Sequence, residues 1–494
     1  MVTIGQISDT WQLTSLDVGW GPVGGIGVTM YAGSFAVPVN DVRSGNWSDP
    51  TTWSLSNVVV LYDRAKTMND ILTGQDWVDA SQGSASFAWQ GLTGGLGPTE
   101  QSVTFPIPLL DYSPVVNVNV GTTLQYNVTI SNSITLDQNA TLNSLSVAAG
   151  GQLNCQPGTS LVLRSGNSQN AGTITGANVT VQSGASLTNL GSLEWSGGSI
   201  IGSGGLTNQG SLTINPTSAT SLFGTLTNSG TITQTTNGVL GIGGGAAVLN
   251  NLAGAVYTIQ GSGQIDEGSG GPGTINNAGL FVKSGTGTAS IYANTAFNNT
   301  GTVEVDSGTL ALSNFTQTAG LTNLNRGNLT FSSPAQILGG QLLGSGTISG
   351  SIVNTGGLLS PGHSAGSIII NGNYTEGPAG ALLVELGGLG NGQFDYLDVN
   401  GTASLGGTLE IAFLNGFNPA VGDTFHIMDF TSLTGDFASI QVLGASGYQF
   451  SEEFTGGGLT LVTQAVPEPS MFVLMGIGAL GLLAYACRRQ KRTA

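Results

Sequence analysis

A short motif recurs nine times between residues 170 and 358 of this 494-residue chain. Each copy consists of an asparagine, one or two further residues, a glycine, any residue and then an apolar residue. Successive motif glycines are 19 to 29 residues apart, and repeat lengths of this size are typical of solenoids. The copies begin at Asn170, Asn189, Asn208, Asn228, Asn251, Asn277, Asn299, Asn325 and Asn354. We therefore expect this region to wind as one repeating structure.

The residues around each motif have the alternation of a short β-strand. After Gly301, Val303 and Val305 can point inward while Glu304 and Asp306 point outward. The region has no helical periodicity, and its spacing is too short for propeller blades of about 40 residues. Antiparallel hairpins use the same Asn-Gly pairs and are the alternative, but the spacing is too long for them. The pattern predicts an all-β fold, a right-handed parallel β-helix.

Asparagine and glycine are expected at the corners of the coils, because both enter left-handed backbone conformations at low cost. Stacked corner asparagines could also pair along the axis, as amide ladders do in cross-β stacks. Strand-like segments carry the pattern back to about residue 115. The sequence thus predicts about twelve coils, held together by backbone ladders and columns of Leu, Val and Ile.

The charge distribution excludes several classes of function. Residues 1–487 carry 6 basic and 27 acidic groups, a net charge of −21, so a basic face for nucleic acid or anionic lipid is excluded. The only histidines are His363 and His426, and the only cysteines are Cys155 and Cys487. Zinc clusters, disulfide frameworks and His-dependent nucleophilic enzymes are therefore disfavoured, and no cofactor is predicted.

The last 29 residues combine three features in a fixed order. Pro467, Glu468 and Pro469 form an extended segment that cannot join a sheet and is open to an enzyme's groove. The uncharged residues 471–487 would form a helix of about 25 Å, which can just span a bilayer. A buried core helix is the alternative, but nothing follows that could cover it. The predicted membrane anchor includes Met471, Leu474, Leu480 and Leu483, and the basic residues that keep the tail in the cytoplasm are Arg488, Arg489, Lys491 and Arg492.

This order closely resembles the PEP-CTERM sorting signal of Gram-negative bacteria. In that family an exosortase, an integral-membrane transpeptidase-like enzyme, recognises the Pro-Glu-Pro element. The resemblance implies an exported protein that is transiently anchored in the bacterial inner membrane through residues 471–487, with a cytoplasmic C-terminus. It is then released or held at the cell surface. No basic residue precedes Arg43, so a signal peptide is not visible and we expect a start upstream of Met1, or a fragment.

Both flanks of the repeat carry further signals. The segment GNWSDPTTW (45–53) resembles the N-terminal start of secreted β-helical passengers, including autotransporter-associated repeat proteins, which implies that Trp47 and Trp53 cap the coil stack. A platform for sugar rings is the alternative role of these tryptophans. The succession from LSPGHSAGSIII (359–370) to GDF (435–437) resembles the C-terminal cap of autotransporter-type β-helices. The predicted domains are an N-terminal β region (1–114), the β-helix (115–358), a C-terminal β cap (359–465) and the sorting signal (466–494).

A few isolated residues could carry chemistry. Cys155 is expected to be an inert buried thiol, and His363 a structural or solvated residue in a Pro-Gly turn. Asp395 and Asp398 lie three apart in a loop, where calcium binding is an alternative to a solvated role. They lack the nonapeptide of calcium-binding β-rolls, and no metal site is assigned.

Two functions are compatible with this sequence. The first is a structural or adhesin-like protein of the cell surface or biofilm matrix, without catalysis, whose polar faces could bind extracellular polysaccharide. The alternative is a polysaccharide lyase or hydrolase acting on extracellular glycan. A lyase needs a base, and the coils offer only Arg164, Lys283 and Arg326. A hydrolase needs two carboxylates, for which the candidates are Asp266 with Glu267, or Glu304 with Asp306. Both pairs are more typical of a solvated face.

Overall fold

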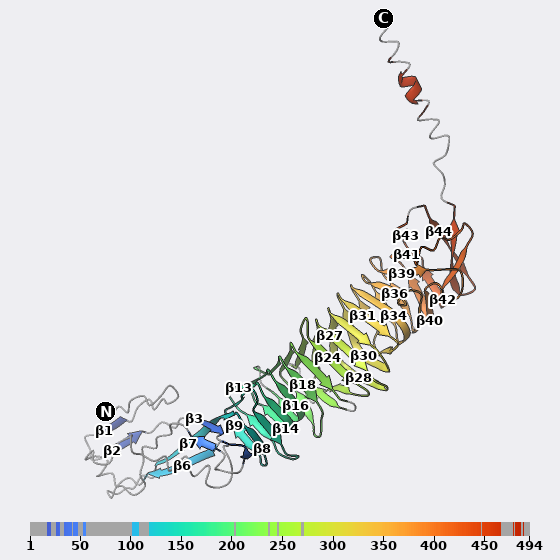
Figure 1. The fold of residues 1–494 in the computed structure, drawn as a ribbon. Coiled ribbons are helices and arrows are strands. Elements are labelled where there is room, and N and C mark those ends of the chain that lie inside the picture. The colour runs from blue at the N-terminus through green and yellow to red at the C-terminus, as the bar shows by residue number, and fades with distance from the viewer. Residues whose placement is uncertain are drawn as a thin grey trace. The chain divides into compact units, whose positions relative to one another are not determined.

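The described part of the chain forms a parallel β-solenoid of about 12 turns in the computed structural model (Figure 1). The structure describes residues 17–20, 26–29, 34–41, 43–47, 53–55, 101–107, 118–465 except 202–203, 236–237, 245–246, 268–270 and 446, and then 478, 480–485 and 488. The predicted all-β parallel fold is confirmed. The chain forms two compact units, residues 1–321 with 327–333 and residues 322–326 with 334–494.

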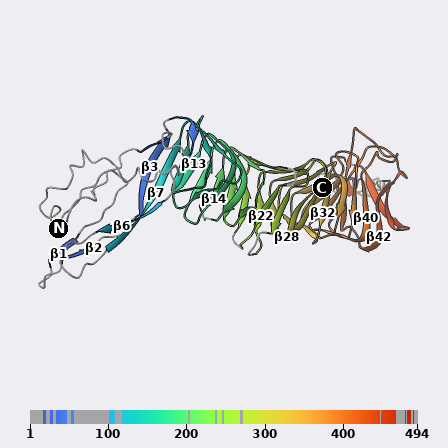
Figure 2. The same cartoon turned by 90° about the horizontal axis from the view of Figure 1, so that it is seen from below.

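In the middle of the first unit, a coil consists of three short strands, and each strand pairs in parallel with the strand three further along the chain. One coil contains β17 (Leu206–Asn208), β18 (Ser211–Ile214) and β19 (Thr220–Leu222). The next contains β20 (Thr225–Asn228), β21 (Thr231–Gln234) and β22 (Val239–Ile242). The pairs β17–β20, β18–β21 and β19–β22 are all in register. Figure 2 shows this stacking from β14 (Thr173–Val181) to β28 (Thr288–Asn299).

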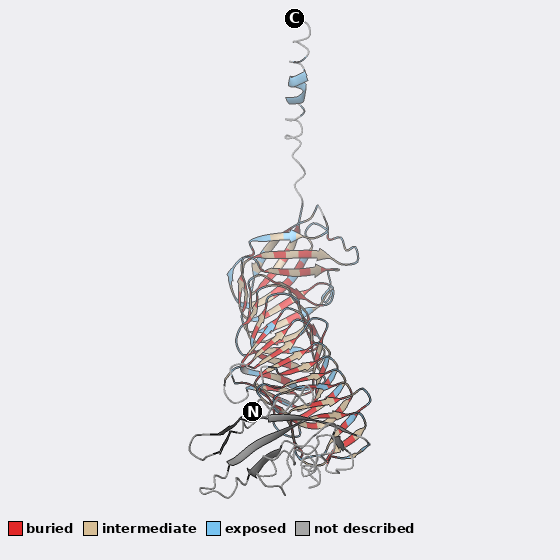
Figure 3. Ribbon diagram, turned by 90° about the vertical axis from the view of Figure 1, so that its left-hand side faces the viewer, coloured by how far each residue is buried: buried red, intermediate tan, exposed pale blue. Residues whose placement is uncertain are grey.

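Alternate residues of each strand point into the coil. Val303 and Val305 are fully buried, while Glu304 and Asp306 are half-buried, as the alternation predicts. Figure 3 shows the same alternation along the strands. In-register pairing turns the inward positions into columns, such as Leu206, Leu226 and Leu249. Each such side chain contributes about 1.5–3 kcal/mol by burial, so the columns are a main source of stability.

Aromatic side chains form one continuous stack inside the first unit. The rings of Tyr257 and Phe281 lie parallel with centroids 5.0 Å apart, and Phe297 meets Phe281 edge-on at 5.0 Å. Phe315 and Phe331 continue the stack at 5.8 and 5.6 Å. These residues belong to β24 (Val256–Gln260), β27 (Leu280–Ser284), β28, β30 (Thr309–Gln317) and β32 (Asn328–Phe331). Ring pairs add about 0.5–1.5 kcal/mol each to the burial of their area.

A ladder of buried amides runs along one corner of the first unit. Each asparagine Nδ2 donates to the Oδ1 of the asparagine in the next coil at 2.7–2.8 Å, from Asn170 to Asn299. A further bond, 3.0 Å long, goes from the Asn299 Nδ2 to the Oε1 of Gln317. All of these side chains are at most 1% exposed. The predicted amide ladder is therefore confirmed. The motif residue Asn325 is exposed, and Gln317 follows Asn299 in the ladder instead.

The reason for the repeated glycines differs from the predicted one. Of the nine motif glycines only Gly254 has a positive φ, of 83°. At Gly191 a Cβ would lie 2.1 Å from the carbonyl oxygen of Gly172, and at Gly210 it would lie 2.1 Å from that of Gly191. The glycines are therefore needed chiefly because successive coils approach each other closely at this corner, where a side chain has no room.

The second unit begins with the same parallel coil pairing. Parallel pairs join β35 to β38, β36 to β39, β37 to β40, β40 to β42, and β39 through β41 to β43. Antiparallel pairing appears where β45 joins both β42 and β44. These strands are β35 (Ile352–Asn354), β36 (Leu358–Pro361), β37 (Ser367–Asn371), β38 (Tyr374–Glu376), β39 (Ala381–Leu386), β40 (Tyr396–Leu405), β41 (Thr408–Phe413), β42 (Thr424–Gly435), β43 (Ser439–Val442), β44 (Gln449–Thr455) and β45 (Gly458–Gln464). Coil geometry thus extends into the segment that was predicted as the cap.

The predicted N-terminal element joins the first coil. The strand β4 (Gly45–Asn46) pairs in parallel with β8 (Ser133–Leu136), and the Trp47 amide donates to the Thr135 carbonyl at 2.8 Å. Trp47 is fully buried, whereas the side chain of Trp53 lies outside the described residues. The capping role of the tryptophan pair stays a prediction.

Candidate functional site

A β-bulge in the second unit brings two polar side chains to one face of the sheet. The register between β42 and β45 shifts between His426 and Met428, which leaves Ile427 as an extra residue. In a regular strand, residues three apart point to opposite faces. The bulge instead places His426 and Asp429 together on the outward face, where the two side chains are 47% and 48% exposed.

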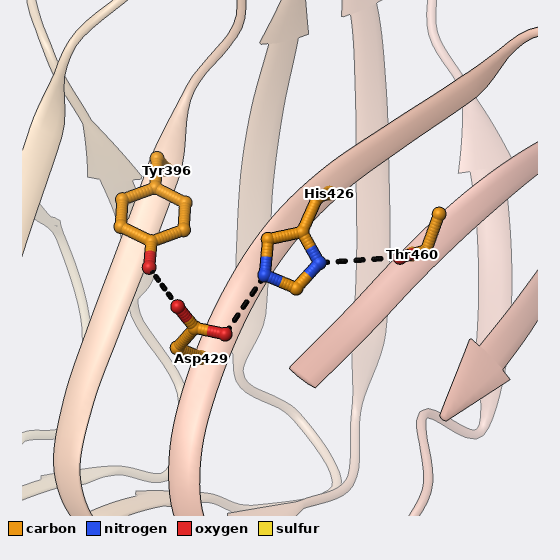
Figure 4. A network of polar contacts seen from close by, with 4 residues as sticks. All are labelled: Tyr396, His426, Asp429 and Thr460. Carbon is orange, nitrogen blue, oxygen red and sulfur yellow. Dashed lines mark hydrogen bonds and ion pairs between the residues drawn. The ribbon is translucent and has the colours of Figure 1, made fainter. Parts of the chain in front are cut away.

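Four side chains from three strands form one chain of hydrogen bonds at this bulge (Figure 4). The Asp429 Oδ1 lies 2.8 Å from the His426 Nε2, and the His426 Nδ1 lies 3.2 Å from the Thr460 Oγ1. The Asp429 Oδ2 accepts a hydrogen bond from the Tyr396 hydroxyl. Tyr396 lies on β40, His426 and Asp429 on β42, and Thr460 on β45.

The absence of a side chain at Gly458 provides the space that this network occupies. Gly458 on β45 is the register partner of Asp429. A Cβ at Gly458 would lie 2.3 Å from the His426 Cε1 and 2.9 Å from the Asp429 Oδ1. Asp398, on the adjacent strand β40, is in register with Asp429, so a second acidic residue lies beside the network.

The hydrogen bonds also set the charges of the network. The bond from Tyr396, followed by that from His426, holds the pKa of Asp429 below its ordinary value. Burial, followed by the bond to Asp429, raises the pKa of Tyr396. An ionised carboxylate therefore orients an imidazole that is bonded to a hydroxyl. Such an arrangement can move protons or, with its oxygen and nitrogen donors, hold a cation.

Of the three basic residues that the coils offer to a lyase, Lys283 is enclosed by the coil itself. Lys283 is fully buried, and its Nζ donates to the backbone carbonyls of Ser284, Gly285 and Ser307 at 2.9, 2.6 and 3.1 Å. Burial lowers the pKa of this amine. Arg164 and Arg326 are exposed, and Arg326 has a left-handed φ of 74°. The structure does not bring Lys283 to a surface where a glycan could meet it.

The two carboxylate pairs proposed for a hydrolase lie on different strands. Asp266 and Glu267 end β25 (Gln264–Glu267), where the Glu267 Oε2 accepts a bond from the Asn294 Nδ2 at 2.8 Å. Glu304 lies on β29 (Thr302–Val305), with Asp306 directly after it. The strand β25 is hydrogen-bonded to β22 and β28, whereas β29 is hydrogen-bonded to β27. The two candidate carboxylate pairs therefore lie on strands that are not neighbours in the sheet.

The remaining candidate residues have structural surroundings. Burial raises the pKa of the Cys155 thiol to about 12, as suits an unreactive group. The His363 Nε2 lies 2.7 Å from the Asn323 Oδ1.

Asp395 and Asp398 have different surroundings. Asp395 is fully buried, and its two oxygens accept bonds from the amides of Gly366 and Glu385 at 2.8 and 3.0 Å. Asp398 lies half-buried on β40. Within the described ranges, no three His, Cys, Asp or Glu side chains are grouped to hold a metal ion.

The predicted sorting residues lie mostly beyond the described part of the chain. Leu480, Leu483 and Arg488 are helical and exposed. Outside the described residues are Pro467, Glu468, Pro469, Met471, Leu474, Arg489, Lys491 and Arg492. Among the residues that the structure does describe, none of the helices has the length and apolar character required to cross a bilayer. The transmembrane helix stays a prediction.

The fold defines the class of this protein as a parallel β-solenoid, and comparison with known families identifies its C-terminal end. The model of the PEP-CTERM protein-sorting motif matches residues 465–490. The chain therefore carries this motif, which implies an exported protein that is sorted through the membrane and processed by exosortase, a membrane enzyme. A comparison with curated proteins finds no match.

Sequence reasoning missed the network at the bulge. The only local signal is the spacing of His426 and Asp429, and three-residue spacing on a regular strand indicates opposite faces. Tyr396 and Thr460 are 30 or more residues from His426 in sequence, and only the pairing of β40, β42 and β45 brings them near it.

Proposed function

We propose that this exported protein is a structural or adhesin-like component of the cell surface or extracellular matrix, without catalytic activity. The observation that carries this proposal is the use of polar groups inside the coils. The Asn170–Gln317 ladder and Lys283 bind neighbouring coils or the coil's own backbone, so these groups serve cohesion. Buried polar groups that are hydrogen-bonded within the coils make a structure rigid, which suits a scaffold.

The outward faces offer uncharged hydrogen-bonding groups in register. Thr188, Thr207 and Thr227 follow one another along the outer side of the Asn ladder. Asn250, Asn276 and Asn298 continue this column and bond to one another at 3.0 Å. Rows of hydroxyls and amides can bind the hydroxyls of extracellular polysaccharide without the charges that a catalytic cleft needs. We infer that polysaccharide is the partner of these faces.

Incubation of the purified protein with pectin, alginate and the matrix of its own host tests this proposal against the lyase or hydrolase alternative. We expect sedimentation with one or more polymers, and neither reducing ends nor unsaturated products above background. The double variant Glu304→Ala and Asp306→Ala is the matched control. Turnover by the wild-type protein that this double variant loses would refute the proposal of a non-catalytic scaffold.

A further inference from the structure

We propose that Tyr396, Asp429 and His426 form a binding site for ferric iron on the outward face of β40 and β42. This inference goes beyond the proposed scaffold function and does not depend on it. It starts from the hydrogen-bonded network at the bulge, whose members are three different kinds of metal donor. A group of acidic residues alone would not suffice, and the tyrosine is the residue that gives this site its chemistry.

The donor set suits an oxidised, strongly Lewis-acidic cation. A phenol oxygen and a carboxylate oxygen are hard donors, and imidazole is a common ligand of iron. Tyrosine is also a known iron ligand. Its phenolate is a hard anionic donor, which stabilises the ferric state. A divalent calcium or magnesium ion would have little use for the imidazole, since those ions prefer oxygen ligands throughout.

The Asp429 carboxylate already contacts both of the other donors. The His426 Nε2 and the Asp429 Oδ1 are 2.8 Å apart, the Tyr396 hydroxyl bonds to the other carboxylate oxygen, and the Tyr396 and His426 ring centroids are 6.2 Å apart. A bound ferric ion would replace the two hydrogen bonds that link Asp429 to Tyr396 and His426 with bonds from the ion to the phenol oxygen, one carboxylate oxygen and the imidazole Nε2. When the ion binds, Tyr396 loses its phenolic proton to solvent. The imidazole binds the ion through Nε2 and carries its one proton on Nδ1.

The surroundings support this exchange. The Thr460 Oγ1, 3.2 Å from the His426 Nδ1, can accept the proton that remains on the imidazole and fix the ring orientation. Gly458 keeps the space beside the imidazole and the carboxylate open. His426 and Asp429 are each about half exposed, so water or another ligand can fill the remaining positions on the ion. Asp398 beside Asp429, and a net charge of −17, attract a cation to this face.

Titration of the metal-free, full-length protein with ferric nitrilotriacetate tests this site. We expect a visible absorption band from charge transfer between tyrosinate and iron, and retention of iron after gel filtration. The variant Tyr396→Phe should lose the band. Asp429→Asn and His426→Asn should weaken iron binding by about tenfold or more. Tyr448→Phe is the matched control, because Tyr448 is a half-buried tyrosine of the same unit that bonds to Asn418, and it should keep the band.

Two outcomes would overturn the assignment. One is the absence of the band and of retained iron in the wild-type protein. The other is a band of undiminished intensity in Tyr396→Phe. Thermal unfolding of each variant shows that it is folded, so a lost band in a folded Tyr396→Phe protein supports direct ligation by the phenol. The glycan experiment described above is independent of these results.

Discussion

In the second unit, the amide pattern recurs in altered form. Asn354 on β35 is in register with Glu376 on β38, so an acid occupies the position that an amide holds in the first unit. Glu376 is 3% exposed, and the Tyr374 hydroxyl donates to its Oε2 at 2.7 Å. Burial raises the pKa of Glu376 from 4.5 to about 8. Glu376 is therefore largely protonated at neutral pH and acts much as a glutamine would.

The substitution Glu376→Gln should make stability less dependent on pH. Because the folded-state pKa is raised, the contribution of Glu376 is complete below about pH 4.5 and is lost as the pH rises through about 8. The wild-type protein should lose on the order of 5 kcal/mol of unfolding free energy across this range from this residue, and the variant should not. Urea unfolding at several pH values measures the difference. Glu410 faces outward on β41, and Glu410→Gln should keep the wild-type dependence of unfolding free energy on pH. The same pH dependence in the wild-type protein and both variants would contradict the prediction.

At the scale of an element, the amide ladder adds side-chain hydrogen bonds between strands that are already paired through their backbones. Asn228 on β20 accepts from the Asn208 Nδ2 and donates to the Asn251 Oδ1, both at 2.8 Å, and to the Val256 carbonyl at 3.0 Å. Water does not reach this corner, so a missing amide leaves buried partners unsatisfied. We therefore expect the ladder to determine the register between strands more strongly than the outward column beside it does.

The variant Asn228→Ala should destabilise the coils around β20 and β23 (Val248–Asn251) by about 1–3 kcal/mol, because buried hydrogen-bonding groups lose their partner. Hydrogen exchange of the amides in these two strands measures the local effect, since solenoids open in parts. Asn276→Ala removes an amide from the half-exposed outward column, where water can replace it, and should have a smaller effect. Equal exchange rates in the two variants would show that burial of the ladder does not matter.

At the scale of the whole molecule, the β-solenoid is joined to a sorting motif that marks it for export. The motif covers residues 465–490, directly after β45, which ends at Gln464 and is the last strand of the described residues. Pro467 and Pro469 lack the backbone N–H that pairing in a sheet requires, so we expect the Pro-Glu-Pro element to be the part that a membrane enzyme recognises.

Replacement of Pro467, Glu468 and Pro469 by alanine should block processing. We expect the variant to accumulate as a longer precursor in the membrane fraction, whereas the wild-type protein is processed and leaves it. Cell fractionation with immunoblotting against the solenoid measures both mass and location. Gln464→Ala, at the end of β45, is the control and should behave as wild type. An alanine variant with wild-type mass and location would show that this segment is not the recognised element.

Much of the fold could be predicted from the sequence, because a solenoid repeats the same neighbours in every coil. The Asn170–Asn299 spacing and the alternation at Val303 and Val305 each indicate a contact that recurs along the axis, so a pattern along the chain maps directly onto space. The sorting motif was visible for a similar reason, since its three parts are contiguous.

Only the tertiary structure decided the features that depend on register between coils. It showed that Gly191 is a glycine because the carbonyl of Gly172 comes within 2.1 Å of its missing Cβ, and that Gln317 follows Asn299 in the ladder. It also enclosed Lys283 and, through the bulge at Ile427, placed His426 beside Asp429. A bulge or a close approach is set by the strands on either side, so residues next to it in sequence carry little sign of it.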